Sequence, residues 1–216
     1  MKISGKSILQ RTGARASCAT VILIPLLAWA GEDYQRHAHA AHQHMTPTEA
    51  KSGDYTLSVR SYTIPEVTLI DSHAQPVRLR EALAAEGPVM VNFIFTSCTA
   101  ICPVMSRIFS QVPGKLGAEA GRLRMISISI DPENDTPQEL EAYAKNFSVN
   151  PRWQFLTGSV ENIQVVQRAF DNYRGDKMNH EPLTFLRPAP EKAWVRIDGF
   201  ASAAELVQEY QKVVLK

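Results

Sequence analysis

The chain has 216 residues, of which 44% are hydrophobic, and its formal net charge at pH 7 is +1. This near-neutral balance excludes the strongly basic surface through which proteins bind nucleic acids, so no nucleic-acid partner is expected. Three cysteines in a chain of this length also exclude a small scaffold held together by several disulfides.

The first thirty residues have the pattern of a secretory signal peptide. An apolar run from Cys18 to Leu27 leads to Ala28-Trp29-Ala30, a small-x-small cleavage pattern, and four cations without any acidic residue come first: Lys2, Lys6, Arg11 and Arg15. Because the run is shorter than the ~20 residues that span a bilayer, we favour cleavage and export to the periplasm over a membrane anchor that faces the periplasm. Removal of residues 1–30 would take the net charge from +1 to about −3.

Residues 31–54 are polar and lack sustained periodicity, which predicts a flexible tether. Within this tether lie side chains that could capture a soft or borderline metal ion: His37, His39, His42, His44 and Met45. Their spacing fits no preformed site, so a solvated, His-rich linker stays open as the alternative.

The folded domain is expected to cover residues 55–216. Short strand-like segments and a turn at Asp71-Ser72-His73 predict an N-terminal β-hairpin extension, with strands at 55–63, 66–70 and 76–79 and a helical turn at 80–85.

Strands and helices alternate after this extension. The segments 89–95 and 124–130 are apolar for most of their length, as in strands that are buried on both faces of a sheet. Further strands are expected at 153–157, 183–187 and 193–197, and helices at 100–116, 136–147, 159–171 and from 202 onward. This order predicts an α/β fold with a central mixed β-sheet flanked by helices.

Cys98 and Cys102 lie where strand 89–95 passes into the next helix. Pro103 is tolerated only in the first turn, so that helix begins near residues 99–102. Cysteines at this spacing on a helix have Cβ atoms about 5–6 Å apart, whereas a relaxed disulfide needs about 3.8 Å. The pair therefore favours a soft-metal clamp first and a redox-active dithiol second, and the helix start favours the thiolate form of both sulfurs.

His180 is the candidate for a third ligand. It lies in a polar loop just before strand 183–187, and this loop is expected to return to the sheet edge that carries the cysteines. Two sulfurs and one imidazole suit copper, with zinc as a competitor, and do not suit magnesium or calcium. Asp131, just past strand 124–130, has a claim to the same edge, whereas Asp135 is expected to cap or order the start of the next helix.

Two blocks and one histidine make the sequence similar to the SCO/SenC family. The blocks are Phe93-Ile94-Phe95-Thr96-Ser97-Cys98-Thr99-Ala100-Ile101-Cys102-Pro103 and Ser127-Ile128-Ser129-Ile130-Asp131-Pro132-Glu133-Asn134-Asp135-Thr136-Pro137, followed by His180. The resemblance runs from about Thr63 to the C-terminus. It implies a thioredoxin-like fold, copper as Cu(I) or Cu(II) on Cys98, Cys102 and His180, and Asp131 beside the site as a residue that tunes it.

The sequence also departs from the family pattern around the histidine. Asn179 stands where members often have an aspartate, Pro182 follows closely, and the segment 183–190 lacks an Asp-Pro-Asp-Gly-like turn. These differences bear on the hydrogen bonds around the histidine more than on the identity of the ligands.

By this resemblance, the leading hypothesis is a monomeric copper chaperone that delivers copper to a cytochrome c oxidase subunit or another copper-receiving protein, and not a turnover enzyme. A thiol–disulfide oxidoreductase that keeps target cysteines reduced is the alternative, with Cys98 as the attacking thiolate. A peroxidase of the peroxiredoxin type is the weakest hypothesis, because no activating arginine and no Pro-x-x-x-Thr-x-x-Cys segment is recognisable.

Overall fold

The computed structural model describes residues 55–215. The expected signal segment 1–30 and tether 31–54, with the tail ligands His37, His39, His42, His44 and Met45, lie outside the described residues.

Eight strands form one mixed sheet in the order β1-β8-β7-β4-β5-β6-β2-β3. Their bounds are β1 Tyr55–Arg60, β2 Thr68–Asp71, β3 Pro76–Arg78, β4 Val89–Ile94, β5 Arg124–Ser129, β6 Trp153–Thr157, β7 Leu183–Arg187 and β8 Trp194–Gly199. The central strands β4, β5 and β6 run parallel, and β7 is antiparallel to β4.

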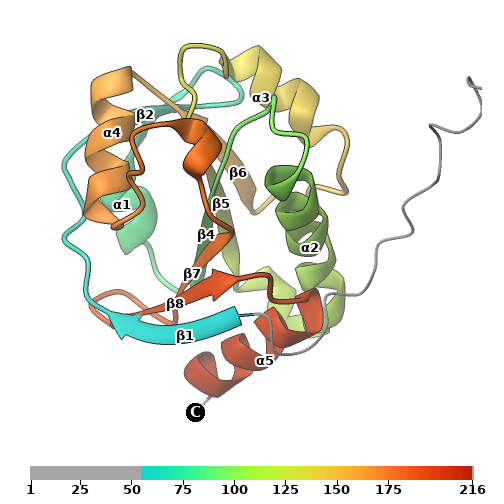
Figure 1. The fold of residues 1–216 in the computed structure, drawn as a ribbon. Helices are drawn as coiled ribbons and strands as arrows, with labels where there is room; N and C mark the ends of the chain where they lie inside the picture. The colour runs from blue at the N-terminus through green and yellow to red at the C-terminus, as the bar shows by residue number, and fades with distance from the viewer. Residues whose placement is uncertain (1–54, 216) are drawn as a thin grey trace, which may run out of the picture. The chain divides into compact units, whose positions relative to one another are not determined.

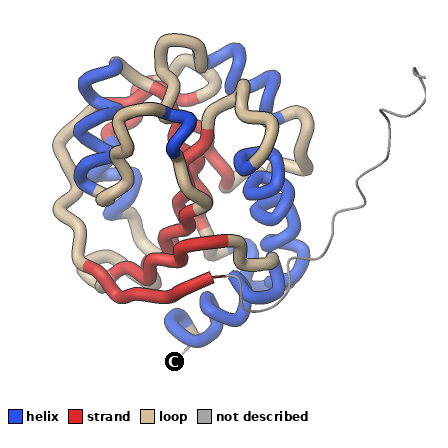
Figure 2. The backbone as a smooth tube through the Cα atoms, in the orientation of Figure 1, coloured by secondary structure: helices blue, strands red, loops and turns tan. Residues whose placement is uncertain are grey.

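Helices cover both faces of this sheet (Figures 1 and 2). Their bounds are α1 Leu79–Ala84, α2 Ile101–Leu116, α3 Pro137–Ala144, α4 Val160–Ala169 and α5 Ala203–Val214, with short 3₁₀ turns η1 Gly117–Gly121 and η2 Lys177–Asn179. Figure 1 shows α1 and α4 on one side of the sheet and α2, α3 and α5 on the other.

The strand β4 is buried along its whole length because its side chains enter both cores. Met90 and Ile94 pack into the core beneath α2, α3 and α5, whereas Val91 and Phe93 pack into the core beneath α1 and α4. This alternation is the period-2 geometry of a strand, and it explains the unbroken apolar run in the sequence.

The sheet register brings three distant segments to one edge. Ile94 at the end of β4 pairs with Ser129 at the end of β5. Because β7 is antiparallel to β4, with Asn92 paired to Thr184, the beginning of β7 lies beside the end of β4. The loops after β4, after β5 and before β7 therefore meet at the same edge of the sheet.

The predicted mixed sheet flanked by helices is confirmed, with differences in detail. The N-terminal hairpin is β2–β3, which joins the sheet beside β6, whereas β1 pairs with β8 at the opposite edge. The helices α3 and α4 end earlier than expected, at Ala144 and Ala169. Among residues 55–215, no helix has the length and apolar character that crossing a membrane requires.

Candidate metal centre

Cys98 and Cys102 flank Ile101, the first residue of α2. Cys98 is in the loop after β4, and Cys102 is in the first turn of the helix, followed by Pro103 as expected. The backbone N–H of Cys102 donates a hydrogen bond to Cys98 Sγ at 3.3 Å. The backbone N–H of Phe95 donates to Cys102 Sγ, also at 3.3 Å. Both sulfurs therefore accept hydrogen bonds from backbone N–H groups, one just after β4 and one in the first turn of α2.

His180 follows η2 and points its ring at the two sulfurs. Its Nε2 atom lies 3.3 Å from Cys102 Sγ and 3.8 Å from Cys98 Sγ. Its Nδ1 atom is 2.9 Å from the carbonyl oxygen of Lys177. Since a carbonyl can only accept, Nδ1 carries the proton, and the lone pair on Nε2 faces the sulfurs.

The three side chains, which we call the triad, have the spacing of a metal site. Their ligand atoms all lie within 4.8 Å of one another. Metal bonds to sulfur and imidazole nitrogen are about 2.0–2.3 Å long, so ligand atoms around one ion are about 3.5–4.0 Å apart. The sulfur–nitrogen distance from Cys98 lies within this range and that from Cys102 lies just below it, so the triad fits one ion with small rotations of its side chains.

Burial acts on the protonation of Cys102 in the opposite direction to the helix start, which favours the thiolate form. Burial raises the pKa of Cys102, and the Phe95 N–H hydrogen bond only partly offsets it. Burial also lowers the pKa of His180, against the opposing effect of the Lys177 carbonyl. Without metal, burial therefore favours the thiol of Cys102, which can donate to the neutral ring, and this effect opposes the preference for thiolate that the helix start predicts.

Asp135 organises the cysteine loop, a role that the sequence did not indicate. Its fully buried carboxylate accepts hydrogen bonds from the backbone N–H and hydroxyl of Thr96 and from the hydroxyl of Ser129. The N-cap of α3 is instead Thr136, whose side chain accepts from the N–H of Glu139. Asp135 thus joins the loops after β4 and β5 and fixes the chain two residues before Cys98.

Asp131 lies at the same sheet edge but does not contact the triad. Its buried carboxylate accepts a hydrogen bond from Asn134 and forms an ion pair with Lys177. Lys177 precedes His180 by three residues and holds the histidine through its backbone carbonyl. The connection from Asp131 to the triad therefore runs through Lys177, which the sequence did not single out.

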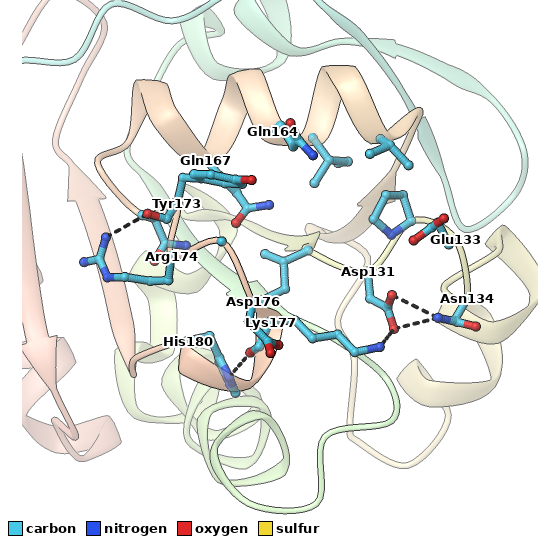
Figure 3. Close-up of a pocket in the computed structure, with 16 residues that line it drawn as sticks. Asp131, Glu133, Asn134, Gln164, Gln167, Tyr173, Arg174, Asp176, Lys177 and His180 are labelled. Carbon is cyan, nitrogen blue, oxygen red and sulfur yellow. Dashed lines mark hydrogen bonds and ion pairs between the residues drawn. The ribbon is translucent and has the colours of Figure 1, made fainter.

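A polar pocket opens next to His180, with a volume of about 480 Å³. It lies between α4 and the loops that follow β5 and α4, as Figure 3 shows. Asp131, Asn134, Gln167, Tyr173 and Lys177 are among the residues that line it. The candidate metal centre therefore borders a cleft on its histidine side, whereas its two cysteines are buried.

Comparison with known proteins agrees with this geometry. A sequence model of the SCO1/SenC family matches residues 55–215. The SCO1 protein homolog of Bacillus subtilis is 44% identical over 70 residues, which are 32% of this chain and 36% of that protein. The chain thus spans about a third of the length of this curated relative.

Solved structures extend the likeness to the whole described domain. The structure of Arabidopsis thaliana ScoI with copper bound is 27% identical, with a TM-score of 0.56 over 67% of this chain and 93% of that one. The structure of BsSco, described as a Sco-family cytochrome c oxidase assembly protein with a disulfide switch, is 26% identical, with a TM-score of 0.61 over 73% and 96%. The fold is thioredoxin-like, and this chain belongs to the SCO1/SenC family.

Proposed function

We propose that this chain is a copper chaperone, which binds one copper ion through Cys98, Cys102 and His180. The single observation that carries the proposal is the convergence of two sulfurs and one imidazole nitrogen, from segments about 80 residues apart, within 4.8 Å. This donor set suits Cu(I), a soft ion that takes few ligands. The copper-bound structure of a relative supports the choice of copper over zinc.

The cargo would pass to a cytochrome c oxidase subunit or another copper-receiving protein. Support for this recipient comes from the description of BsSco as an oxidase assembly protein. The pocket beside His180 would let the ligands of a recipient approach the centre from its histidine side. The chain would act after export, in the periplasm, as a released or membrane-anchored protein.

A second candidate is a thiol–disulfide oxidoreductase that acts on cysteines of the recipient. Cys98 is the more accessible of the two cysteines, with 8% of the residue exposed against 0% for Cys102, and its sulfur accepts a hydrogen bond from the N–H of Cys102 at the helix start. It would therefore attack a target disulfide, and Cys102 would resolve the mixed disulfide, leaving two thiols on the target and a disulfide here.

Anaerobic Cu(I) titration of the full chain against a chromogenic chelator tests the proposal. We expect one tightly bound equivalent in a variant whose four tail histidines are alanine, and a loss of affinity of roughly 10–100-fold or more for His180→Ala. Disulfide exchange with a model thiol should survive in His180→Ala. Loss of exchange with unchanged copper affinity would instead favour the oxidoreductase.

The same titration tests copper capture by the tail. If His37, His39, His42 and His44 bind copper, the unmodified chain should bind more than one equivalent, with the excess held weakly. Equal capacity with and without these histidines would eliminate this role.

A further inference from the structure

Lys177 contacts His180 through its backbone and Asp131 through its side chain. Its carbonyl oxygen accepts the Nδ1 proton of His180, which fixes the ring tautomer that leaves Nε2 free. The same carbonyl oxygen also accepts a hydrogen bond from the backbone N–H of His180, at 3.2 Å. The backbone of Lys177 therefore sets both the position and the rotation of the imidazole.

The side chain of Lys177 extends away from η2 and is anchored in the loop that follows β5. Its ammonium pairs with Asp131, whose side chain is 7% exposed, whereas that of Lys177 is 33% exposed. Figure 3 shows this side chain reaching across to Asp131. An ion pair with one buried partner is screened less by solvent than a surface pair, so it can hold a short loop in place.

A third contact joins the same lysine to the ring of the histidine. The ammonium of Lys177 lies 5.4 Å from the centre of the Phe95 ring. The Phe95 ring packs edge-on against His180 at 4.9 Å. Lys177, Phe95 and His180 thus form one packed unit above the cysteines, and Asp131 holds that unit to the end of β5.

We infer that Lys177 is a positioning residue for the metal ligand His180, and that its ion pair with Asp131 is a latch that holds the imidazole over the two sulfurs. This inference rests on the proposed function. Opening the latch would release η2 (Lys177–Asn179) and with it the third ligand, leaving copper on the two sulfurs alone. Asp131 would thus influence the position of His180 through Lys177, without contacting the ion.

The test compares Lys177→Met, which keeps the length of the side chain and removes its charge, with Lys177→Arg, which restores the charge. Cu(I) affinity should fall by roughly 10-fold in Lys177→Met and recover in Lys177→Arg. In a His180→Ala background, Lys177→Met should cause no further loss. A loss that persists in that background would overturn the inference, because Lys177 would then act without the histidine.

A metal-free measurement provides an independent readout. Amide hydrogen exchange at Asn179 and His180, whose N–H groups bond to Asp176 and Lys177, should accelerate in Lys177→Met. Asp131→Asn should give the same acceleration if Lys177→Met folds poorly. Unchanged exchange and unchanged copper affinity in both variants would refute the latch.

Lys212→Met is the matched control, because Lys212 also pairs with a buried carboxylate, that of Glu209, far along the chain on α5. Lys212→Met should change neither copper affinity nor amide exchange at η2. If it lowers copper affinity as much as Lys177→Met does, the loss comes from removing any lysine–carboxylate pair and not from Lys177 in particular. If the unmodified chain binds no Cu(I), the proposed function fails. If the unmodified chain binds Cu(I) and Lys177→Met changes neither Cu(I) affinity nor amide exchange, only the latch fails.

Discussion

Cys102 is the residue whose chemical state has to change when the metal enters. It is fully buried, and this burial raises its pKa well above that of a free thiol. The metal binds the thiolate, so binding must displace the proton of the Cys102 thiol, whose sulfur lies 3.3 Å from the His180 ring. The proton on the sulfur is thus the competitor of the ion at neutral pH.

We therefore predict that Cu(I) affinity rises with pH. Raising the pH lowers the cost of removing the Cys102 proton, and each proton displaced on binding gives up to about a tenfold gain in affinity per pH unit. His180 adds little above neutral pH, since its pKa is lowered and its ring is already neutral. Chelator competition between pH 6 and 8 measures the slope, and an affinity independent of pH would contradict the prediction.

Asp135 is the second residue with a specific stability role. Asp135→Ala would leave the N–H and hydroxyl of Thr96 and the hydroxyl of Ser129 without their acceptor inside the protein. Unsatisfied buried groups cost about 1–3 kcal/mol each, so we expect a loss of at least about 2 kcal/mol in the free energy of unfolding.

Urea unfolding of the metal-free protein measures this loss. Glu133→Ala, on an exposed position in the same loop, is the control and should change stability little. A loss below about 0.5 kcal/mol for Asp135→Ala, as for an ordinary surface substitution, would show that Asp135 does not hold the cysteine loop.

At the scale of the elements, the position of the cysteines depends on how α2 is held. The helix α2 packs with α5 in one core that also contains Cys98 and Cys102. The start of α5 carries a complete capping box, in which Ser202 accepts from the N–H of Glu205 and Glu205 accepts from the N–H of Ser202. The position of α2 therefore depends in part on α5, whose N-terminal cap does not contact the ligands.

Ser202→Ala should lower the free energy of unfolding by about 1 kcal/mol, because the helix loses its cap. Copper affinity should stay within about twofold, since the substitution touches no ligand or ligand partner. Urea unfolding and chelator titration of the same variant measure both quantities. A large loss of affinity would mean that the position of α2 is coupled to α5 more tightly than the contacts indicate.

At the scale of the whole molecule, the triad ties the loop after β4 to the loop before β7. A ligand that binds only the folded protein stabilises it by about 1.4 kcal/mol for each tenfold excess of free ligand over its dissociation constant. We predict that buffered Cu(I) raises the unfolding midpoint of the unmodified chain and does so less in His180→Ala. Thermal unfolding at fixed free Cu(I) measures the shift, and equal shifts in both proteins would exclude His180 as a ligand.

Much of the fold was predictable because its signals are local. The apolar runs of β4 and β5, the position of Pro103 and the alternation of strands and helices each depend on a few neighbouring residues. Helix ends were less predictable: α3 and α4 stop at Ala144 and Ala169, two or three residues earlier than expected. The separation of β1 from the β2–β3 hairpin, on opposite edges, depends on pairing with strands far along the chain.

The sequence by itself determined the ligand types, the soft-metal chemistry of two nearby cysteines and the sheet edge that carries them. Tertiary structure alone decided three features: the orientation of the His180 ring toward the sulfurs, the hydrogen bond from Thr96 to Asp135, and the ion pair between Asp131 and Lys177. These contacts join residues about 40 to 80 positions apart, whose meeting depends on sheet register. Burial, which no local pattern sets, raises the pKa of Cys102 against the preference for thiolate at the start of its helix.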